Sequence, residues 1–299
     1  MDRFHLIRVF VAVVQAKGLA GAARTLSISA PAVTRAVQEL EDHLGVRLLA
    51  RTTRSVHPTE AGERYFEDCR RILAEMAEAD ESAAGTRTAA RGHLTVTAPA
   101  LFGSIFVTPI VTEYLNLHAE VSVSCWFVDR VVNLVEEGVD AALRIGELED
   151  SSIQALRVGQ VRRVICAAPG YLARRGRPRV LDDLQGHDII QASGVTPAPQ
   201  WRLRDNGTPR VVKLEPRLIS TSNDAALAAA VEGFGLVQLL SYQVAAALRE
   251  GRLEILLADF EPASLPVHLL HREGRHASQK VRAFIDLAVE RLRAQPALR

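Results

Sequence analysis

One short helical pattern near the N-terminus carries hydrogen-bonding side chains at spacings that suit contact with DNA. Ser29 is a good helix N-cap, and Pro31 falls in the first turn, where its missing N–H costs nothing. Val33, Val37 and Leu40 follow at helical spacing and predict a buried face. With the N-cap, the residues that we expect to be exposed are Ser29, Ala30, Pro31, Ala32, Thr34, Arg35 and Gln38. Because this face is short and mostly small, with a few hydrogen-bonding tips, it can lie in a major groove.

A basic, hydroxyl-rich tip follows this helix. Gly45 suits a left-handed cap at the helix end, and segments 46–49 and 55–58 predict two short strands. The tip between the strands consists of Arg51, Thr52, Thr53 and Arg54. Such a wing suits phosphate contact or an arginine placed in a minor groove. The first sixty residues carry eight Lys/Arg against five Asp/Glu, an excess of +3 in a chain whose total is +1.

A second helix must hold the exposed face in place. Ala22, Ala23 and Leu26 give a preceding short helix a small apolar face, and a tight turn joins the two helices. The pair with its wing is typical of a winged helix-turn-helix that binds double-stranded DNA. A helical hairpin that serves only for packing is the alternative, since such pairs also occur in proteins that never touch DNA. The basic tip directly after the helix favours DNA binding.

A long helix is expected next, from the cap at Thr59 to about Ala84. Its apolar residues recur at alternating spacings of four and three, and they are Tyr65, Cys69, Ile72, Met76, Ala79 and Ala83. A heptad seam with charged flanks predicts a homodimer, which suits a reader of two-fold symmetric DNA. The alternative is one apolar face that packs on the chain's own domain. Segment 85–92 then breaks the pattern and predicts a hinge linker.

The order of these features resembles the DNA-binding domain of LysR-type transcriptional regulators. The resemblance is carried by residues 21–60, including Leu48-Leu49-Ala50-Arg51-Thr52-Thr53-Arg54, and by Pro58-Thr59-Glu60-Ala61-Gly62. It implies an α/β protein with an all-α-type N-terminal winged helix-turn-helix, a dimerising linker helix and a two-lobed, periplasmic-binding-protein-like effector domain. We accordingly expect domains at 1–58, 59–91 and 92–299. Ala20 departs from the pattern, because many members carry Ser or Thr there and so have a capping hydroxyl that this chain lacks.

From residue 93 onward the chain alternates strand-like and helix-like segments, which indicates an α/β domain with mainly parallel sheets. The predicted strands are 94–98, 121–128, 141–145, 161–168, 189–190, 237–240 and 267–271, with an antiparallel excursion near 201 and 211–214. The predicted helices are 102–115, 131–137, 171–174, 182–187, 221–231 and 279–293. Segments 129–140, 144–146 and 169–172 resemble the effector domain of the same family. That resemblance implies lobe I at about 92–161 and 267–299, and lobe II at about 162–266.

Three segments are expected to meet in the cleft between these lobes, where strand ends and helix starts converge. The candidate effector-binding residues are Pro99, Ala100, Leu101, Phe102, Gly103, Ser104, Arg144, Ile145, Gly146, Thr221, Ser222 and Asn223. Free backbone N–H groups at two helix starts, with hydroxyls and a guanidinium, suit a small carboxylate effector. Thr221 as a plain helix cap and Arg144 in a salt bridge are the alternatives. Leu240-Ser241-Tyr242 departs from the Pro-Ser-Tyr common in relatives, so the loop there has its own shape.

Several other classes of protein are disfavoured. The sequence has no Gly-x-Ser-x-Gly, Walker, His-Glu-x-x-His or Cys-x-x-Cys motif, so we expect no enzyme, no cofactor and no metal site. Cys69, Cys125 and Cys166 are too scattered for a disulfide framework; the last two are expected to be buried, with a redox-sensing pair as the alternative. No apolar run approaches the roughly 20 residues of a membrane span, and the N-terminus lacks the features of a signal peptide. A cytoplasmic protein without a membrane partner is therefore expected.

These features together predict a ligand-responsive regulator that binds promoter DNA as a dimer or tetramer, with RNA polymerase as a further candidate partner. Effector binding would change the angle between the lobes, and with it the dimer contacts and the spacing of the winged helices on DNA. The strongest competitor from another class is a cytoplasmic solute-binding module with a helical adaptor that does not bind DNA.

Overall fold

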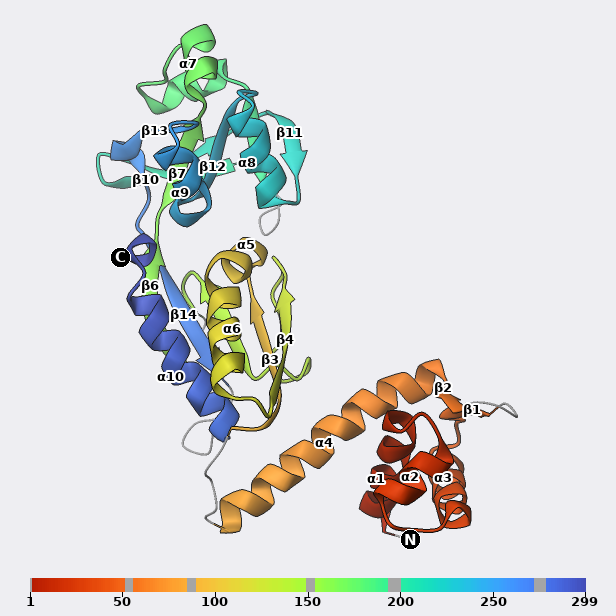
Figure 1. Ribbon diagram of the computed structural model, residues 1–299. Coiled ribbons are helices and arrows are strands. Elements are labelled where there is room, and N and C mark those ends of the chain that lie inside the picture. The colour runs from red at the N-terminus through yellow and green to blue at the C-terminus, as the bar shows by residue number, and fades with distance from the viewer. Residues whose placement is uncertain (1, 52–55, 85–89, 149–153, 193–199, 272–277) are drawn as a thin grey trace. The chain divides into compact units, whose positions relative to one another are not determined.

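The structure is a computed structural model that describes residues 2–51, 56–84, 90–148, 154–192, 200–271 and 278–299 (Figure 1). The chain divides into two compact units, Met1–Thr88 and Ala89–Arg299. Each unit has its own hydrophobic core, and each is described by itself below.

The N-terminal unit is a three-helix core followed by a hairpin and a long helix. Its elements are α1 (Arg3–Gln15), α2 (Leu19–Thr25), α3 (Ala30–Leu44), β1 (Leu49–Arg51), β2 (Val56–Pro58) and α4 (Glu60–Ala84). Phe10 of α1 and Val33, Val37 and Leu40 of α3 are fully buried in one cluster. The predicted inward face of α3 is therefore confirmed. Gly45 ends α3 with a φ of 66°, the left-handed cap that its position predicts.

The first strand of the hairpin begins later than predicted, at Leu49 instead of Val46. The carboxylate of Glu41, on α3, is the physical reason. Its Oε1 accepts hydrogen bonds from the backbone N–H groups of Leu48 (2.7 Å) and Leu49 (2.9 Å). The Leu48 amide is thus bonded to a side chain, and ladder pairing starts where Leu49 lies opposite Pro58.

The apolar seam of helix α4 is buried in its first half, and Ile72 and Met76 further along it are exposed. Thr59 caps the helix as predicted, since Thr59 Oγ1 accepts from the Gly62 N–H at 3.0 Å. Cys69 is fully buried and Tyr65 packs beside it in the core of the N-terminal unit. Ile72 and Met76, one to two turns further on, are 41% and 43% exposed. The first half of the seam therefore follows the alternative reading, packing on its own domain, whereas Ile72 and Met76 are available to a partner.

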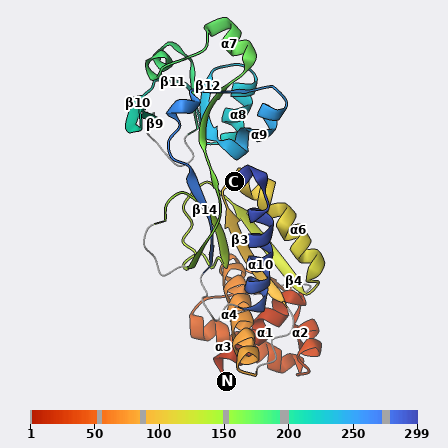
Figure 2. The same cartoon turned by 90° about the vertical axis from the view of Figure 1, so that its left-hand side faces the viewer.

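Lobe I of the C-terminal unit is a five-stranded sheet with strand order β4-β3-β5-β14-β6. The strands are β3 (Gly92–Ala98), β4 (Val121–Phe127), β5 (Ala141–Ile145), β6 (Gln154–Val161) and β14 (Leu265–His271). Helices α6 (Thr108–Leu117) and α10 (Gln279–Arg293) lie together on one side of this sheet (Figures 1 and 2). Their core contacts include Tyr114 and Phe284, whose rings meet edge to face at 5.5 Å.

The helical segment before α6 is continuous with it. It comprises α5 (Ala100–Phe102) and a π-helical turn, η1 (Gly103–Val107). By length and hydropathy alone, Ala100–Leu117 is long and apolar enough to cross a membrane. Here its side chains Phe102, Val107 and Tyr114 are buried in the lobe I core, as in the core helix of a soluble protein.

Lobe II is a second five-stranded sheet with strand order β11-β8-β12-β7-β13. Its strands are β7 (Arg163–Ala167), β8 (Ile189–Ala192), β11 (Pro216–Ser220), β12 (Leu236–Leu240) and β13 (Glu254–Leu256). The core on one side comes from α8 (Asn223–Val231) and α9 (Ser241–Arg249). The core on the other side includes α7 (Pro169–Arg175), η2 (Leu181–Gly186) and the antiparallel hairpin β9 (Gln200–Asp205) and β10 (Thr208–Lys213). Short 3-10 turns at η3 (Ala258–Phe260) and η4 (Pro296–Leu298) complete the chain.

Both sheets are mixed, which corrects the expectation of mainly parallel sheets. Strand β3 runs parallel to β4 and β5, but β14 runs antiparallel to β5 and β6. In lobe II, β12 is parallel to β8 and antiparallel to β7. The two crossings between lobes explain this, because β7 and β14 each arrive from the other lobe and enter their sheet from the end at which the parallel strands finish.

The helix predicted at 131–137 is wrong, since the segment is a turn. The Asn133 side chain is the cause. Its Oδ1 accepts from the Val135 (3.1 Å) and Glu136 (3.4 Å) amides, and the Glu137 carboxylate accepts from the Asn133 amide (3.1 Å). Side chains thus satisfy the N–H groups that a helix would need, and Gly138, with a φ of 63°, ends the turn.

Other predictions need smaller corrections. Cys125 is exposed rather than buried, because β4 is an edge strand of its sheet. The strand predicted at 161–168 is the end of β6 and all of β7, and β6 itself, β11, β13 and α9 were not predicted. Strand β5 and helix α10 have the bounds that the sequence predicts.

Candidate DNA-binding and effector-binding sites

The face of α3 opposite the core presents two long polar side chains to solvent. Arg35 and Gln38 are exposed, and neither makes a hydrogen bond or ion pair within the described residues. Ser29 Oγ accepts from the Ala32 N–H at 3.3 Å, so the N-cap is formed as predicted. Thr34 Oγ1 donates to the Ala30 carbonyl at 3.1 Å. Its hydroxyl proton is thereby used within the helix, which leaves the Arg35 and Gln38 tips for a ligand.

The remaining predicted DNA contacts fall into two groups. On α3, Ala30 and Pro31 are exposed, while Ala32 and Thr34 are half-buried. On the wing, Arg51 is the last residue of β1, and Thr52, Thr53 and Arg54 lie outside the described residues. The carboxylate of Glu41 fixes the start of the wing to α3 through the Leu48 and Leu49 amides, so the helix and the wing base form one rigid part.

The C-terminal unit has a cavity of about 240 Å³ at the meeting of its two lobes. Four predicted effector residues line it, namely Pro99, Arg144, Ile145 and Asn223. The other lining residues are Val128, Asp129, Arg130, Val131, Arg163, Ala192, Gln238, Leu239, Leu240, Tyr242, Gln243 and Leu265.

The carboxylate of Asp129 occupies the place predicted for the effector's acid group. Its Oδ1 accepts from the Ala100 N–H at 2.9 Å, at the start of the lobe I helix. Its Oδ2 accepts from Asn223 Nδ2 at 3.2 Å, at the start of α8 in lobe II. The chain thus supplies its own anion to the lobe I helix start, and the same anion joins the two lobes.

Three arginines line the cavity, and their partners differ. Arg130 donates to both oxygens of Glu137, at 2.8 and 2.6 Å, and this guanidinium lowers the pKa of Glu137 to about 2. Arg144 Nη2 donates to the Val132 carbonyl at 2.8 Å, and within the described residues Arg144 makes no ion pair. The alternative reading, a salt bridge at Arg144, is therefore not observed among these residues. Burial lowers the pKa of Arg144, which shows that its charge lies partly out of water. Arg163 has no hydrogen-bonding or ionic partner in the described part of the chain.

Most of segment 100–104 lies away from this cavity. Phe102 is fully buried and packs on Phe106 and Tyr242, at ring distances of 4.8 and 5.4 Å. Gly103 is a close-packing glycine, because a Cβ there would lie 2.3 Å from the Phe127 ring. The Ala100 N–H donates to the Asp129 carboxylate, and Leu101 packs against the lobe I core.

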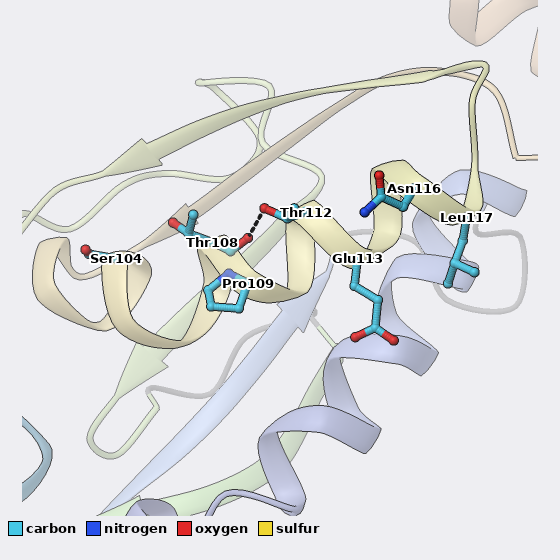
Figure 3. A pocket seen from close by; sticks show the side chains of 7 residues that line it. All are labelled: Ser104, Thr108, Pro109, Thr112, Glu113, Asn116 and Leu117. Atoms are coloured by element: carbon cyan, nitrogen blue, oxygen red, sulfur yellow. Dashed lines mark hydrogen bonds between the residues drawn. The ribbon is translucent and has the colours of Figure 1, made fainter.

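Ser104 belongs to a different hollow, which lies along the outer side of α6 (Figure 3). This hollow is about 590 Å³ and is lined by Ser104, Thr108, Pro109, Thr112, Glu113, Asn116 and Leu117. Thr112 Oγ1 donates to the Thr108 carbonyl at 2.9 Å, and Glu113 is bound by Arg291 of α10 at 2.6 and 2.9 Å. The Thr112 hydroxyl and the Glu113 carboxylate of this hollow are thus already hydrogen-bonded within the protein.

The other predicted residues outside the cavity have structural roles. Ser222 caps α8, with its Oγ accepting from the Ala225 N–H at 3.3 Å, and Thr221 is exposed beside it. Thr221 is therefore not the cap that the alternative reading proposed. Gly146 has a φ of 120° and donates its N–H to the Pro266 carbonyl at 2.9 Å.

Sequence reasoning missed the lobe II wall of the cavity. Gln238 and Leu239 come from β12, and Tyr242 and Gln243 from the start of α9. Gln243 Oε1 accepts from the Leu240 N–H at 2.8 Å and so closes the α9 start. The signal for this wall in the sequence is Leu240-Ser241-Tyr242, where the chain departs from the family pattern and α9 begins.

Comparison with known proteins identifies two family domains in this chain. A family model described as the LysR substrate binding domain matches residues 87–293, and one described as the bacterial regulatory helix-turn-helix protein, lysR family, matches residues 4–63. The chain belongs to the LysR family. It is 33% identical over 282 residues to an uncharacterized HTH-type transcriptional regulator of Haemophilus influenzae, covering 94% of this chain and 98% of the relative. It is 31% identical over 288 residues to the regulator CrgA of Neisseria meningitidis, covering 96% of each.

Solved structures of full-length LysR-type regulators share the fold. CrgA from Neisseria meningitidis has a TM-score of 0.62 at 30% identity, covering 96% of this chain and 98% of CrgA. The Vibrio cholerae virulence activator AphB has a TM-score of 0.62 at 25% identity, covering 96% of this chain and 99% of AphB. This LysR-type protein is therefore a transcriptional regulator and not an enzyme. Regulators of this type bind promoter DNA through the helix-turn-helix, respond to small-molecule effectors and form oligomers.

Proposed function

We propose that this regulator reads DNA bases mainly with Arg35 and Gln38, and holds the DNA backbone with Arg51, Thr52, Thr53 and Arg54 of the wing. The exposure of the two α3 side chains and their lack of partners in the described chain support this reading. The smaller residues of this face would make close contact with the edges of the DNA groove; they are Ser29, Ala30, Pro31, Ala32 and Thr34. With so few long side chains on α3, DNA shape would contribute part of the specificity.

We further propose a homodimer formed through the second half of α4, and a homotetramer built from two such dimers. Ile72 and Met76 support the first step, since both are exposed apolar side chains on one side of the helix. In this proposal the domains are 1–58, 59–91 and 92–299, with lobe I at about 92–161 and 267–299 and lobe II at about 162–266. A two-fold dimer would present two recognition helices to a palindromic operator.

The proposed effector is a small carboxylate that binds in the 240 Å³ cavity. Arg144 supports an anion because its charge is partly desolvated and, although Glu137 lies near it, it forms no ion pair within the described residues. Ile145 and Leu265 would contact an apolar part of the ligand. Binding there would favour one angle between the lobes over another. This changes the affinity for DNA only if the two lobe arrangements make different contacts in the dimer.

A cytoplasmic location is part of the proposal, since a promoter-binding regulator must reach DNA. RNA polymerase would be the partner through which bound regulator alters transcription. Neither activation nor repression is favoured by the residues of the two sites.

The deciding experiment is a gel shift with the DNA upstream of the protein's own operon. Arg35→Ala is expected to weaken binding about tenfold or more, as a lost base contact does, while circular dichroism stays unchanged. Arg249→Ala is the matched control, because Arg249 is an exposed arginine at the end of α9 in the other unit. Equal binding by wild type and Arg35→Ala would contradict the assignment of α3 as the recognition helix.

A further inference from the structure

Two hydrogen-bond donors on the lobe II wall of the effector cavity have no acceptor. Arg163, at the start of β7, makes no hydrogen bond or ion pair among the described residues. Gln238 Nε2, on β12, is buried and also lacks a partner there. Both residues line the cavity. The buried amide of Gln238 is costly without an acceptor, and the exposed guanidinium of Arg163 faces the same cavity, so the two mark a place where a ligand oxygen would be stabilised.

The strand register brings these donors to one place. Strands β7 and β12 are antiparallel neighbours, with Arg163 opposite Leu240 and Ile165 opposite Gln238. Gln238 is therefore the diagonal neighbour of Arg163 on the same face of the sheet. Diagonal neighbours lie about 7–8 Å apart at the backbone, within reach of two long side chains. One oxyanion can thus accept from both.

The local charges favour an anion at this place. Desolvation in the cavity wall and, second, the guanidinium of Arg202 lower the pKa of Arg163. Arg202 likewise has no hydrogen bond or ion pair in the part of the chain that is described. An anion would offset both effects. Gln243 Oε1 accepts from the Leu240 amide at 2.8 Å, and within the described residues it receives no hydrogen bond from Arg163 or Gln238.

The alternative anion seat at the lobe I helix start is already filled. Asp129 holds the Ala100 N–H at 2.9 Å and Asn223 Nδ2 at 3.2 Å. A ligand carboxylate placed there would lie against the Asp129 carboxylate and be repelled by it. The effector's acid group must then find its donors elsewhere in the cavity.

We propose that the acid group of the effector binds in lobe II, between the guanidinium of Arg163 and the side-chain amide of Gln238, and that its apolar body packs on Leu240 and Ile145. This assignment rests on the anionic effector proposed above. The ligand is a small carboxylic acid with a compact apolar body. Arg163 sets the preference for acid over amide, whereas Gln238 binds a carbonyl or carboxylate oxygen of either.

The test is isothermal titration of the full-length protein with three acid and amide pairs, namely benzoate with benzamide, butyrate with butyramide, and acetate with acetamide. Wild type is expected to prefer at least one acid over its amide by about tenfold, as a charge-assisted hydrogen bond gives. Arg163→Met should abolish that preference and leave amide binding unchanged. Gln238→Leu should weaken both members of the pair, and Arg249→Met, on an exposed helix end, should change neither.

Two results overturn the assignment in different ways. If the preference for acid survives Arg163→Met and is lost in Arg144→Met, the anionic effector stands and its acid group sits in lobe I. If wild type prefers none of the three acids, the anionic effector itself is wrong, while DNA binding in the gel shift is unaffected. The melting temperature of each unliganded variant shows whether it is folded.

Discussion

Glu41 shows how one side chain can join two parts of a DNA-binding unit. It is 4% exposed, and one of its oxygens accepts the Leu48 and Leu49 amides of the wing base. Removal of this carboxylate would leave two backbone N–H groups without acceptors. We expect Glu41→Ala to lower the free energy of unfolding of the N-terminal unit by about 1–3 kcal/mol. Asp42→Ala, at the exposed neighbouring position, should have little effect.

Two optical signals separate the units in this measurement. Both tryptophans, Trp126 and Trp201, lie in the C-terminal unit, so urea unfolding followed by their fluorescence reports on that unit. Far-UV circular dichroism reports on the helices of both. A Glu41→Ala protein whose dichroism midpoint matches that of Asp42→Ala would show that the wing base does not depend on this carboxylate.

At the residue level, local roles could be predicted and distant partners could not. The Ser29 cap and the left-handed Gly45 depend on their own neighbours in sequence, and both are confirmed. Asp129 was missed because its partners, Ala100 and Asn223, are 29 and 94 residues away. No spacing along the chain marks such a carboxylate as the anion at a helix start.

Among the elements, α4 carries the clearest consequence for assembly. Its seam divides, with Cys69 in the core of its own unit and Ile72 and Met76 exposed. We expect the double variant Ile72→Glu/Met76→Glu to weaken the dimer at least about a hundredfold, since each buried apolar side chain contributes roughly 1.5–3 kcal/mol. Sedimentation equilibrium measures this dissociation constant.

The control for that variant lies on the same helix. Glu67 is exposed, faces away from the seam at 3.6 residues per turn, and pairs with Arg70 at 2.8 Å. Glu67→Lys should therefore leave the dissociation constant unchanged within about threefold. Dimers of equal strength in the double variant and in wild type would place the interface elsewhere.

Element prediction failed where side chains replaced backbone partners. Val131, Leu134 and Val135 have helical spacing, yet Asn133 and Glu137 take the amides of that segment. Val131 and Val135 are 83% and 58% exposed, whereas Val132 and Leu134 are buried, so the inward residues of this segment do not follow helical spacing. Helix α10 succeeded because its inward residues follow one helical period against the lobe I core, and β5 succeeded because it is a short apolar run that is buried on both faces.

For the whole molecule, the two-lobed arrangement came from family resemblance and not from periodicity. Alternating helices and strands indicate an α/β domain, but they do not say which strands cross between sheets. The antiparallel direction of β14 and β7 follows from those crossings. The local pattern could therefore predict most helices and strands of this unit but not which of their residues line the cleft. The lobe II donors Arg163 and Gln238 were missed for that reason.

The bond between Asp129 and Asn223 is the feature on which lobe closure depends most directly. It joins lobe I to lobe II at 3.2 Å through a charged acceptor. Such bonds contribute about 1.5–3 kcal/mol, so Asn223→Ala should shift the equilibrium toward open lobes by about tenfold to a hundredfold. X-ray scattering of residues 90–299, expressed alone, should then give a larger radius of gyration than wild type.

Ser222→Ala is the matched control for this change. It removes the α8 cap, in which Ser222 Oγ accepts the Ala225 N–H, and leaves the Asn223 side chain in place. It should lower the stability of the unit without opening it. If Asn223→Ala and Ser222→Ala scatter alike, the lobes are held by packing, and an effector would have to act on that packing to move them. If only Asn223→Ala expands, a ligand that competes for the Asp129 carboxylate opens the lobes, whereas an acid bound at Arg163 leaves that bond in place.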